Sequence, residues 1–264
     1  MPQKNSRKEY GAGGYYHIYN RGVEKREIFL DDQDYKVFLS YVKLYLDLPN
    51  LQGLALKDGE NRTISPSRTP KNYHDEIVLL AYCLMPNHFH FLIKQSTDRG
   101  IAEFMQSLVL KYVLYFNKKY RRVGGLFQGR YKTVRIRNET QFTYITKYIH
   151  RNPLDLLPSR PGLEGLAKYK YSSYGNYLGL FRQSWVKTDD ILHYFSKTNL
   201  KFSYQNFVEE TGDISRVYYE MIDLDDWPSR PGLEGWWSGI KTIDIVYSID
   251  VSFGRSLFKS KWLI

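Results

Sequence analysis

The sequence has little of what covalent cross-links or membrane spans require. Its 264 residues include one cysteine, Cys83, within an apolar stretch, so neither a disulfide framework nor a cysteine metal site can form within one chain. No run approaches about 18 consecutive apolar residues, and the N-terminal MPQKNSRKEYGAGG lacks the apolar core of a signal peptide. We therefore expect a soluble protein of the reducing cytoplasm with no membrane partner.

Acidic residues are scarce where basic residues gather. Lys and Arg number 38 and Asp and Glu 28, a net charge of +10, and residues 213–264 alone carry a net −2. The stretch 104–138 holds nine basic and no acidic residues, with aromatic residues between them. Cations for phosphates and flat rings for bases suit single-stranded nucleic acid, although a solvated basic surface has the same composition. The residues predicted to bind DNA are Lys111, Lys118, Lys119, Arg121, Arg122, Arg130, Tyr131, Lys132, Arg135 and Arg137.

The hydrophobic pattern predicts an α+β fold. Strands are expected at 14–20, 77–85, 88–95 and 127–136, and helices at 31–47, 99–120 and 139–152. The first six elements follow the order of a split βαβ unit with an antiparallel sheet, the ferredoxin-like plan. The last helix, which starts at Glu139 and stops at Pro153, is an addition to that plan. Short helices are predicted at 188–195 and 203–210.

Composition divides the chain into three parts. Residues 1–157 are predicted to form one domain, interrupted at 48–75 by a polar insertion with several prolines and glycines. Residues 158–212 are expected to be a helical C-terminal extension, and 213–264 a tail of unknown role. The octapeptide PSRPGLEG occurs at 158–165 and again at 228–235. This spacing is too long, and the copy too short, for a solenoid repeat, and we assign the repeat no function.

The segment LMPNHFHFLI, residues 84–93, contains two histidines one residue apart. On a strand, His88 and His90 share one face, while Phe89, Phe91 and Ile93 share the other. The apolar side chains can enter a core, which leaves the imidazoles on the open side of the sheet. Two neutral imidazoles can bind one divalent cation and leave positions for oxygen ligands and a substrate. The alternative is a pair of packed histidines satisfied by hydrogen bonds.

A polar and aromatic stripe follows on the helix at 139–152. Tyr144, Tyr148 and Asn152 are spaced four residues apart and so lie along one side of it. The amide oxygen of Asn152 could bind a cation, and a cation near a phenol, whose pKa is about 10, favours the phenolate nucleophile. An aromatic stripe is also typical of a helix that faces the core. The spacing alone leaves Tyr144 and Tyr148 both open as the nucleophile.

With these patterns in view, the chain resembles the HUH single-strand transposase family, and within it the REP-associated tyrosine transposases. The resemblance covers roughly residues 14–210. Four stretches carry it, namely YYHIYNRGVEKREIFLDDQDYKVFL (15–39), AYCLMPNHFHFLI (81–93), GGLFQGRYKTVRI (124–136) and YITKYIHRNPL (144–154). RPGLEG and YKYSSYGNYLG, within 160–179, resemble the segment that often follows in the family.

The resemblance implies both a fold and a chemistry. It implies a ferredoxin-like domain in which His88 and His90 bind Mg²⁺ or Mn²⁺, with Asn152 beside the ion. It selects Tyr148 as the nucleophile that cleaves and rejoins single-stranded or hairpin DNA through a 5′-phosphotyrosine. The acting form would be a monomer or a homodimer. The chain departs from the family in the length of the 48–75 insertion and in residues 213–264, which match nothing in it.

Other functions fit parts of the same pattern. A relaxase or rolling-circle nickase would use the same metal and tyrosine chemistry, although the sequence lacks the GxxxxGK[ST] loop of a large replication initiator. A domesticated, non-catalytic protein that binds hairpin DNA or RNA would keep the basic tract and need neither Tyr148 nor a metal. A metal-dependent hydrolase would use the histidines and form no covalent adduct.

Overall fold

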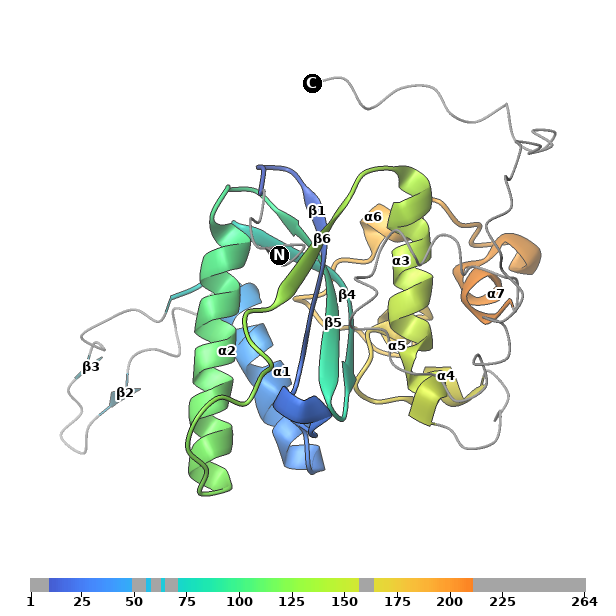
Figure 1. The fold of residues 1–264 in the computed structure, drawn as a ribbon. Helices are drawn as coiled ribbons and strands as arrows, with labels where there is room; N and C mark the ends of the chain where they lie inside the picture. Colours follow the sequence, from blue (N-terminus) through green and yellow to red (C-terminus); the bar gives the residue numbers. More distant parts are fainter. Residues whose placement is uncertain (1–9, 49–55, 58–62, 65–70, 157–163, 211–264) are drawn as a thin grey trace, which may run out of the picture. The chain divides into compact units, whose positions relative to one another are not determined.

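A four-stranded antiparallel sheet lies at the centre of the residues that the structure, a computed structural model, describes: 10–48, 56–57, 63–64, 71–156 and 164–210. Its strands are β1 (Tyr15–Arg21), β4 (Ile77–Met85), β5 (His88–Gln95) and β6 (Lys132–Ile136), in the order β4-β5-β1-β6. All neighbouring strands are antiparallel. The α+β class with an antiparallel sheet is therefore confirmed, and helices pack on both faces of the sheet (Figure 1).

The hairpin of β4 and β5 forms where the apolar pattern predicts it. Strand β4 is almost continuously apolar because it is buried on both faces, and Pro86–Asn87 makes the turn into β5. On β5, the side chains of Phe89, Phe91 and Ile93 are fully buried on the face covered by the first two long helices. Removing the apolar surface of each buried ring of this kind from water contributes about 1.5–3 kcal/mol to the stability of the fold.

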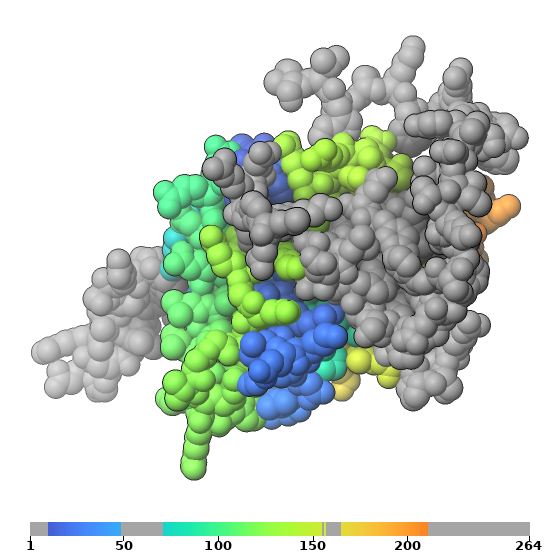
Figure 2. Space-filling view, in the orientation of Figure 1, coloured from blue at the N-terminus to red at the C-terminus, as the bar shows by residue number. Residues whose placement is uncertain are grey.

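Two helices cover this first face. Helix α1 (Asp32–Leu46) starts at its cap residue Asp31, whose side chain accepts a hydrogen bond from the Asp34 backbone N–H at 3.0 Å. Helix α2 (Gly100–Lys119) packs along α1, and its last residue, Lys119, forms ion pairs with both Asp31 and Asp34 at 2.7 Å. The space-filling view shows α2 and the residues after it at the surface beside the first elements of the chain (Figure 2).

Strand β6 is shorter than the 127–136 prediction. Phe127 makes only an isolated bridge with Gly22, and the Gln128 backbone N–H donates to the Arg21 carbonyl. The chain then bends at Gly129, whose φ of +142° is accessible to glycine at little cost. The apolar residues of 127–131 are buried by this loop rather than by a strand, so the first half of that prediction is wrong.

The second face of the sheet is covered as well. Helix α3 (Glu139–Arg151) packs against β4 and β5, and residues 164–210 complete a second core around Leu92, Ile145 and Val208. The elements after α3 are short: η3 (Asn152–Leu156), α4 (Glu164–Lys168), α5 (Tyr174–Tyr177), α6 (Asp189–Leu192), η4 (Leu200–Phe202) and α7 (Tyr204–Glu209). The expectation that this side is open is therefore wrong, because the extension supplies the apolar side chains that close it.

Other predictions fall partly or wholly outside the described residues. Within 48–75, the structure describes a two-stranded antiparallel ladder of β2 (Leu56–Lys57) and β3 (Thr63–Ile64). The tail at 213–264 and nearly all of both PSRPGLEG copies lie outside the described residues, and the division into three parts stays a prediction. None of the described helices is long and apolar enough to cross a membrane.

His150 ties α3 to the residues that follow it. Its imidazole is fully buried, with Nδ1 2.6 Å from the Tyr204 hydroxyl and Nε2 2.8 Å from the Ser173 hydroxyl. The Ser173 hydroxyl is bonded in turn to the backbone of Tyr82 on β4. Burial lowers the pKa of His150 to about 3, so the imidazole is neutral in the folded protein.

We expect the stability of the protein to fall from pH 7 to pH 5 in part through His150. Its folded pKa lies below the unfolded value, so the unfolded chain gains protons first and stability is lost from about pH 6.5 downward to about pH 3. His150→Gln should be less stable at pH 7, yet lose about 2 kcal/mol less than the wild type on going to pH 5. Urea unfolding at the two pH values measures this, and equal losses in both proteins would contradict it.

Candidate metal and tyrosine site

The two histidines lie at the start of β5, on the face covered by α3. In the register with β1, His88 is opposite Arg21 and His90 is opposite Tyr19. The two imidazole rings are 4.9 Å apart. His90 is buried, at 4% exposed, whereas His88 is half-buried at the end of the strand. The predicted pair therefore shares a face and opens to solvent at the His88 end.

Each imidazole is held through its Nδ1 atom. Nδ1 of His88 is 2.6 Å from the Asn87 side-chain oxygen, and Nδ1 of His90 is 2.9 Å from Nε2 of His17 on β1. The buried Nε2 of His90 has no hydrogen-bond partner among the residues described. A buried ring nitrogen without a partner is unusual, and it is the kind of atom that a bound cation would satisfy.

The surroundings keep both imidazoles neutral. Burial lowers the pKa of His88 to about 4, with a further contribution from the Arg21 guanidinium, while a hydrogen bond with the Asn152 side chain opposes the fall. Burial also holds the pKa of His90 well below its usual range, helped by His88, His17 and Arg21. Metal binding requires neutral imidazole, so neither histidine must lose a proton to act as a ligand at pH 7.

Helix α3 brings the tyrosine to the histidines. The helix starts at Asn138, whose side chain accepts from the Gln141 backbone N–H. Nearly three turns later, the Tyr148 ring packs edge-to-face with His90. The ring centroids are 5.3 Å apart and the ring planes 86° apart, and the His17 ring lies at 5.8 Å. Tyr148 is 5% exposed. The phenol therefore lies against the paired imidazoles.

Asn152 closes the group from the end of α3. Its side-chain N–H donates to the Tyr148 carbonyl at 2.9 Å, and its side chain also hydrogen-bonds with His88. Tyr144, one turn earlier, instead packs against Phe207 of α7, with ring centroids 5.2 Å apart. The structure thus gathers His88, His90, Tyr148 and Asn152, and it places Tyr144 against the C-terminal extension.

The available donors suit a metal site with free coordination positions, and not one in which protein side chains fill every position. No group of three or more His, Cys, Asp and Glu side chains is arranged to hold a metal ion in the described part of the chain. The available donors are two imidazoles and one amide, so water and substrate oxygens would complete the coordination of an ion. The partnerless Nε2 of His90 fits this role. Nitrogen donors favour Mn²⁺ over Mg²⁺, which prefers all-oxygen shells.

The residues predicted to bind DNA lie in several places. Lys132 of β6 is opposite Tyr19 and so shares the face of the histidines, whereas Arg135 is opposite Tyr16 on the other face. Lys111 lies over the rings of Tyr41 and Tyr45 on the first face. The side chains of Lys118, Arg121, Arg130 and Arg137 are exposed, and that of Arg122 is half-buried beside the Phe116 ring.

Two members of the predicted DNA-binding set already have partners within the protein. Lys119, with 22% of its side chain exposed, is paired with Asp31 and Asp34, which hold its pKa above the usual value although burial lowers it. Tyr131 is buried, and its hydroxyl is 2.7 Å from that of Tyr10.

The sequence reasoning missed His17 and Arg21. Both lie on β1 with side chains on the histidine face, since Arg21 is opposite His88 and His17 is bonded to His90. The signal was available in the strand YYHIYNR, where every second residue, 15 through 21, faces the same side. Pairing of this strand with the His-x-His strand could not be read from the local pattern.

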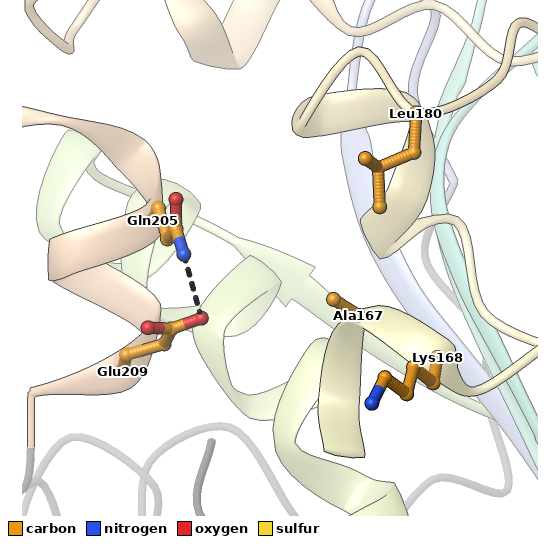
Figure 3. A pocket seen from close by; sticks show the side chains of 5 residues that line it. All are labelled: Ala167, Lys168, Leu180, Gln205 and Glu209. Carbon is orange, nitrogen blue, oxygen red and sulfur yellow. Dashed lines mark hydrogen bonds between the residues drawn. The ribbon is translucent and has the colours of Figure 1, made fainter. Parts of the chain in front are cut away.

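A cleft is lined by residues outside this group. A shallow cleft of about 320 Å³ is lined by residues of α4 and α7 and by Leu180 (Figure 3). Its polar side chains include Lys168 and Glu209, and the latter accepts from Gln205 at 3.2 Å and from Tyr174 at 3.1 Å. Because Glu209 already has these partners, and the lining of the cleft includes neither the two histidines nor Tyr148, the cleft adds nothing to the histidine and tyrosine site.

Comparison with known proteins gives this arrangement a family. Residues 68–152, which contain both histidines, Tyr148 and Asn152, match the family described as "Transposase IS200 like". The chain therefore contains an IS200-like transposase domain. No curated protein matches the sequence.

Two solved structures are similar to the chain. The REP-associated tyrosine transposase bound to a REP hairpin shares 15% identity, with a TM-score of 0.45, and the match covers 76% of this chain and 97% of that one. A candidate transposase from Deinococcus radiodurans R1 also shares 15% identity, with a TM-score of 0.30, over 57% of this chain and 97% of that one.

Proposed function

We propose that the protein is a metal-dependent single-stranded DNA endonuclease and strand transferase that acts through a 5′-phosphotyrosine on Tyr148. The observation that carries the proposal is the contact of the Tyr148 ring with the His88–His90 pair, in which the buried Nε2 of His90 has no partner in the described part of the chain. The match of residues 68–152 to IS200-like transposases supports it.

The topology supports the same family of folds. The chain order strand, helix, strand, strand, helix, strand, combined with the sheet order β4-β5-β1-β6, is what a ferredoxin-like split βαβ unit requires. In this plan the two central strands are β5 and β1. They carry His88, His90, His17 and Arg21, so the proposed site rests on the most constrained part of the sheet, with α3 as the added helix that brings the nucleophile.

The proposed step is a transesterification. The Tyr148 oxygen forms a bond to a backbone phosphorus and gives up its proton, the bond from phosphorus to the preceding 3′ oxygen breaks, and that oxygen takes up a proton. A divalent ion held by His88, His90 and Asn152 would supply charge stabilisation at the phosphate oxygens. The phosphotyrosine conserves the energy of the phosphodiester, so a 3′-hydroxyl can reverse the step and join strands without ATP.

The substrate is proposed to be single-stranded or hairpin DNA, of the REP or transposon-end kind. His88 and Arg21 are the half-exposed members of the group, so a phosphate would enter from their end of β5 and β1. Lys132 on the edge strand β6 shares this face. Cations at these positions would fix the backbone of the strand, and base contacts elsewhere would select the sequence.

Lys132 and Arg135 give a matched pair of variants for this placement. Both lie on β6, three residues apart, but on opposite faces of the sheet. We expect Lys132→Gln to weaken binding of a hairpin with a single-stranded arm about tenfold and to lower its salt slope by about 1, since one phosphate contact is lost. Arg135→Gln should change the affinity and the salt slope much less. Fluorescence anisotropy at several salt concentrations measures this, and equal effects would contradict the assignment of the binding face.

Incubation of the protein with labelled hairpin oligonucleotides and Mn²⁺, followed by denaturing electrophoresis, tests the function itself. A band of protein covalently attached to DNA supports the proposal. Tight binding of cognate DNA without an adduct would instead indicate a non-catalytic hairpin-binding protein. Cleavage that releases all products, and survives loss of the Tyr148 hydroxyl, would indicate a metal-dependent hydrolase.

A further inference from the structure

His17 is a buried side chain that contacts the histidine pair, although it belongs to neither the His-x-His motif nor the tyrosine helix. It lies on the central strand β1, two residues before Tyr19, which is opposite His90. This diagonal position brings the two imidazoles nearly parallel, with ring centroids 5.2 Å apart and 16° between planes. Because β1 is paired on both sides, by β5 and β6, the position of His17 is fixed by backbone hydrogen bonds.

The bond between His17 and His90 joins two nitrogens, so one of them must donate. If His90 donates from Nδ1, its Nε2 is a bare lone pair, which is the form that binds a metal. If His17 donates from Nε2 instead, neutral His90 carries its proton on Nε2. That N–H would then be buried with no acceptor within the described structure, at the cost of an unsatisfied donor.

We infer that His17 is a positioning residue that accepts a hydrogen bond from Nδ1 of His90 and so presents the Nε2 lone pair of His90 to the divalent cation. The same ring lies 5.8 Å from the Tyr148 ring, so it also supports the nucleophile's side of the site. Asn87 plays the matching part for His88, through its side-chain oxygen 2.6 Å from Nδ1. Outer partners of this kind fix the tautomer and orientation of a metal-binding histidine. The inference rests on the proposed function for the presence of the ion.

Binding of Mn²⁺ to the full chain without DNA tests this role separately from catalysis. Titration calorimetry or electron paramagnetic resonance measures the affinity. We expect His17→Phe, which keeps an aromatic ring but accepts no hydrogen bond, to bind Mn²⁺ about 10–100-fold more weakly than the wild type. His17→Gln, whose amide oxygen can accept from His90, should recover most of the affinity. His150→Gln removes a buried imidazole elsewhere on the same face and should leave Mn²⁺ affinity unchanged.

A second measurement does not depend on a variant that folds. Magnetic resonance of the protein with its six histidines labelled with nitrogen-15 reports which ring nitrogen carries the proton in the metal-free wild type. The His90 signals are assigned by their loss in His90→Ala. The inference predicts that His90 is protonated on Nδ1. Protonation on Nε2, or wild-type Mn²⁺ affinity in His17→Phe, would overturn it while leaving the Tyr148 adduct and the proposed function intact. A wild-type protein that forms no Mn²⁺ complex at His90 would overturn the inference and the metal-dependent function together.

Discussion

Tyr148→Phe is expected to abolish the covalent attachment of the protein to DNA, with a loss of at least about a thousandfold in the rate of adduct formation. The substitution removes only the hydroxyl, which is the nucleophile of the proposed step. The ring contacts to His90 and His17 are kept, so the fold and hairpin binding should change little. Denaturing electrophoresis with labelled hairpins measures the adduct, and anisotropy measures binding.

Tyr144→Phe is the matched control for this result. Tyr144 lies on the same helix one turn earlier, but its ring contacts Phe207 rather than the imidazoles. Loss of its hydroxyl should leave adduct formation near the wild-type rate. An adduct that persists in Tyr148→Phe and disappears in Tyr144→Phe would show that the helix presents the other tyrosine, and the site described above would be wrong.

His90→Ala is expected to lower the rate of cleavage about 10²–10³-fold, since charge stabilisation by a bound cation contributes several kcal/mol to transfer at phosphorus. Chelation of the metal in the wild type should have a similar effect, reversed by added Mn²⁺. The buried position of His90, and its Nε2 without a partner among the described residues, make it the proposed ligand least open to replacement by water. Rates at saturating DNA, with and without Mn²⁺, measure the effect.

His193→Ala serves as the control for removal of an imidazole. His193 is exposed and packs on Tyr194, away from the histidine pair. Its loss should alter neither the rate nor the response to Mn²⁺. If His90→Ala cleaves at the wild-type rate and still responds to Mn²⁺, the ion acts elsewhere, and the paired imidazoles are packing residues.

The hairpin of β4 and β5 was among the most predictable parts of the fold. Ile77–Met85 and His88–Gln95 match the predicted ranges because each is a long apolar or alternating run bounded by a Pro–Asn turn. The helices at 31–47, 99–120 and 139–152 also formed within one or two residues of their predicted ends. Local periodicity and capping residues such as Asp31 decide these elements, so the sequence is sufficient for them.

The predictions that failed depend on contacts between distant segments. Residues 127–131 have the composition of a strand, but Asn20 and Arg21 bond the backbone of Gln128 and Gly129 and hold them in a loop. The imidazole face was expected to be open because the apolar side chains of the His-x-His strand could enter a core on its other face. The apolar side chains of residues 164–210 close that face through a core shared with α3, which no short window of sequence reveals.

The candidate site was predictable only in part, because some of its residues also meet through contacts between distant segments. His88, His90, Tyr148 and Asn152 follow from strand and helix spacing together with the family resemblance. His17 and Arg21 enter only through the register of β1 with β5, which pairs residues 73 and 67 positions apart along the chain. Register of this kind is set by the assembled sheet, so the outer partners of a site are harder to read from sequence than its motif.

Peptide mapping of the protein–DNA adduct tests the central claim most directly. A hairpin oligonucleotide with a single-stranded arm, labelled separately at its two ends, would be incubated with the wild type and Mn²⁺, and the covalent product digested and sequenced by mass spectrometry. The account predicts that the DNA is attached to Tyr148 through a 5′-phosphate, so that the 3′ label stays with the protein and the 5′-labelled fragment ends in a free 3′-hydroxyl. Attachment to any other residue, or retention of the 5′ label, would contradict it.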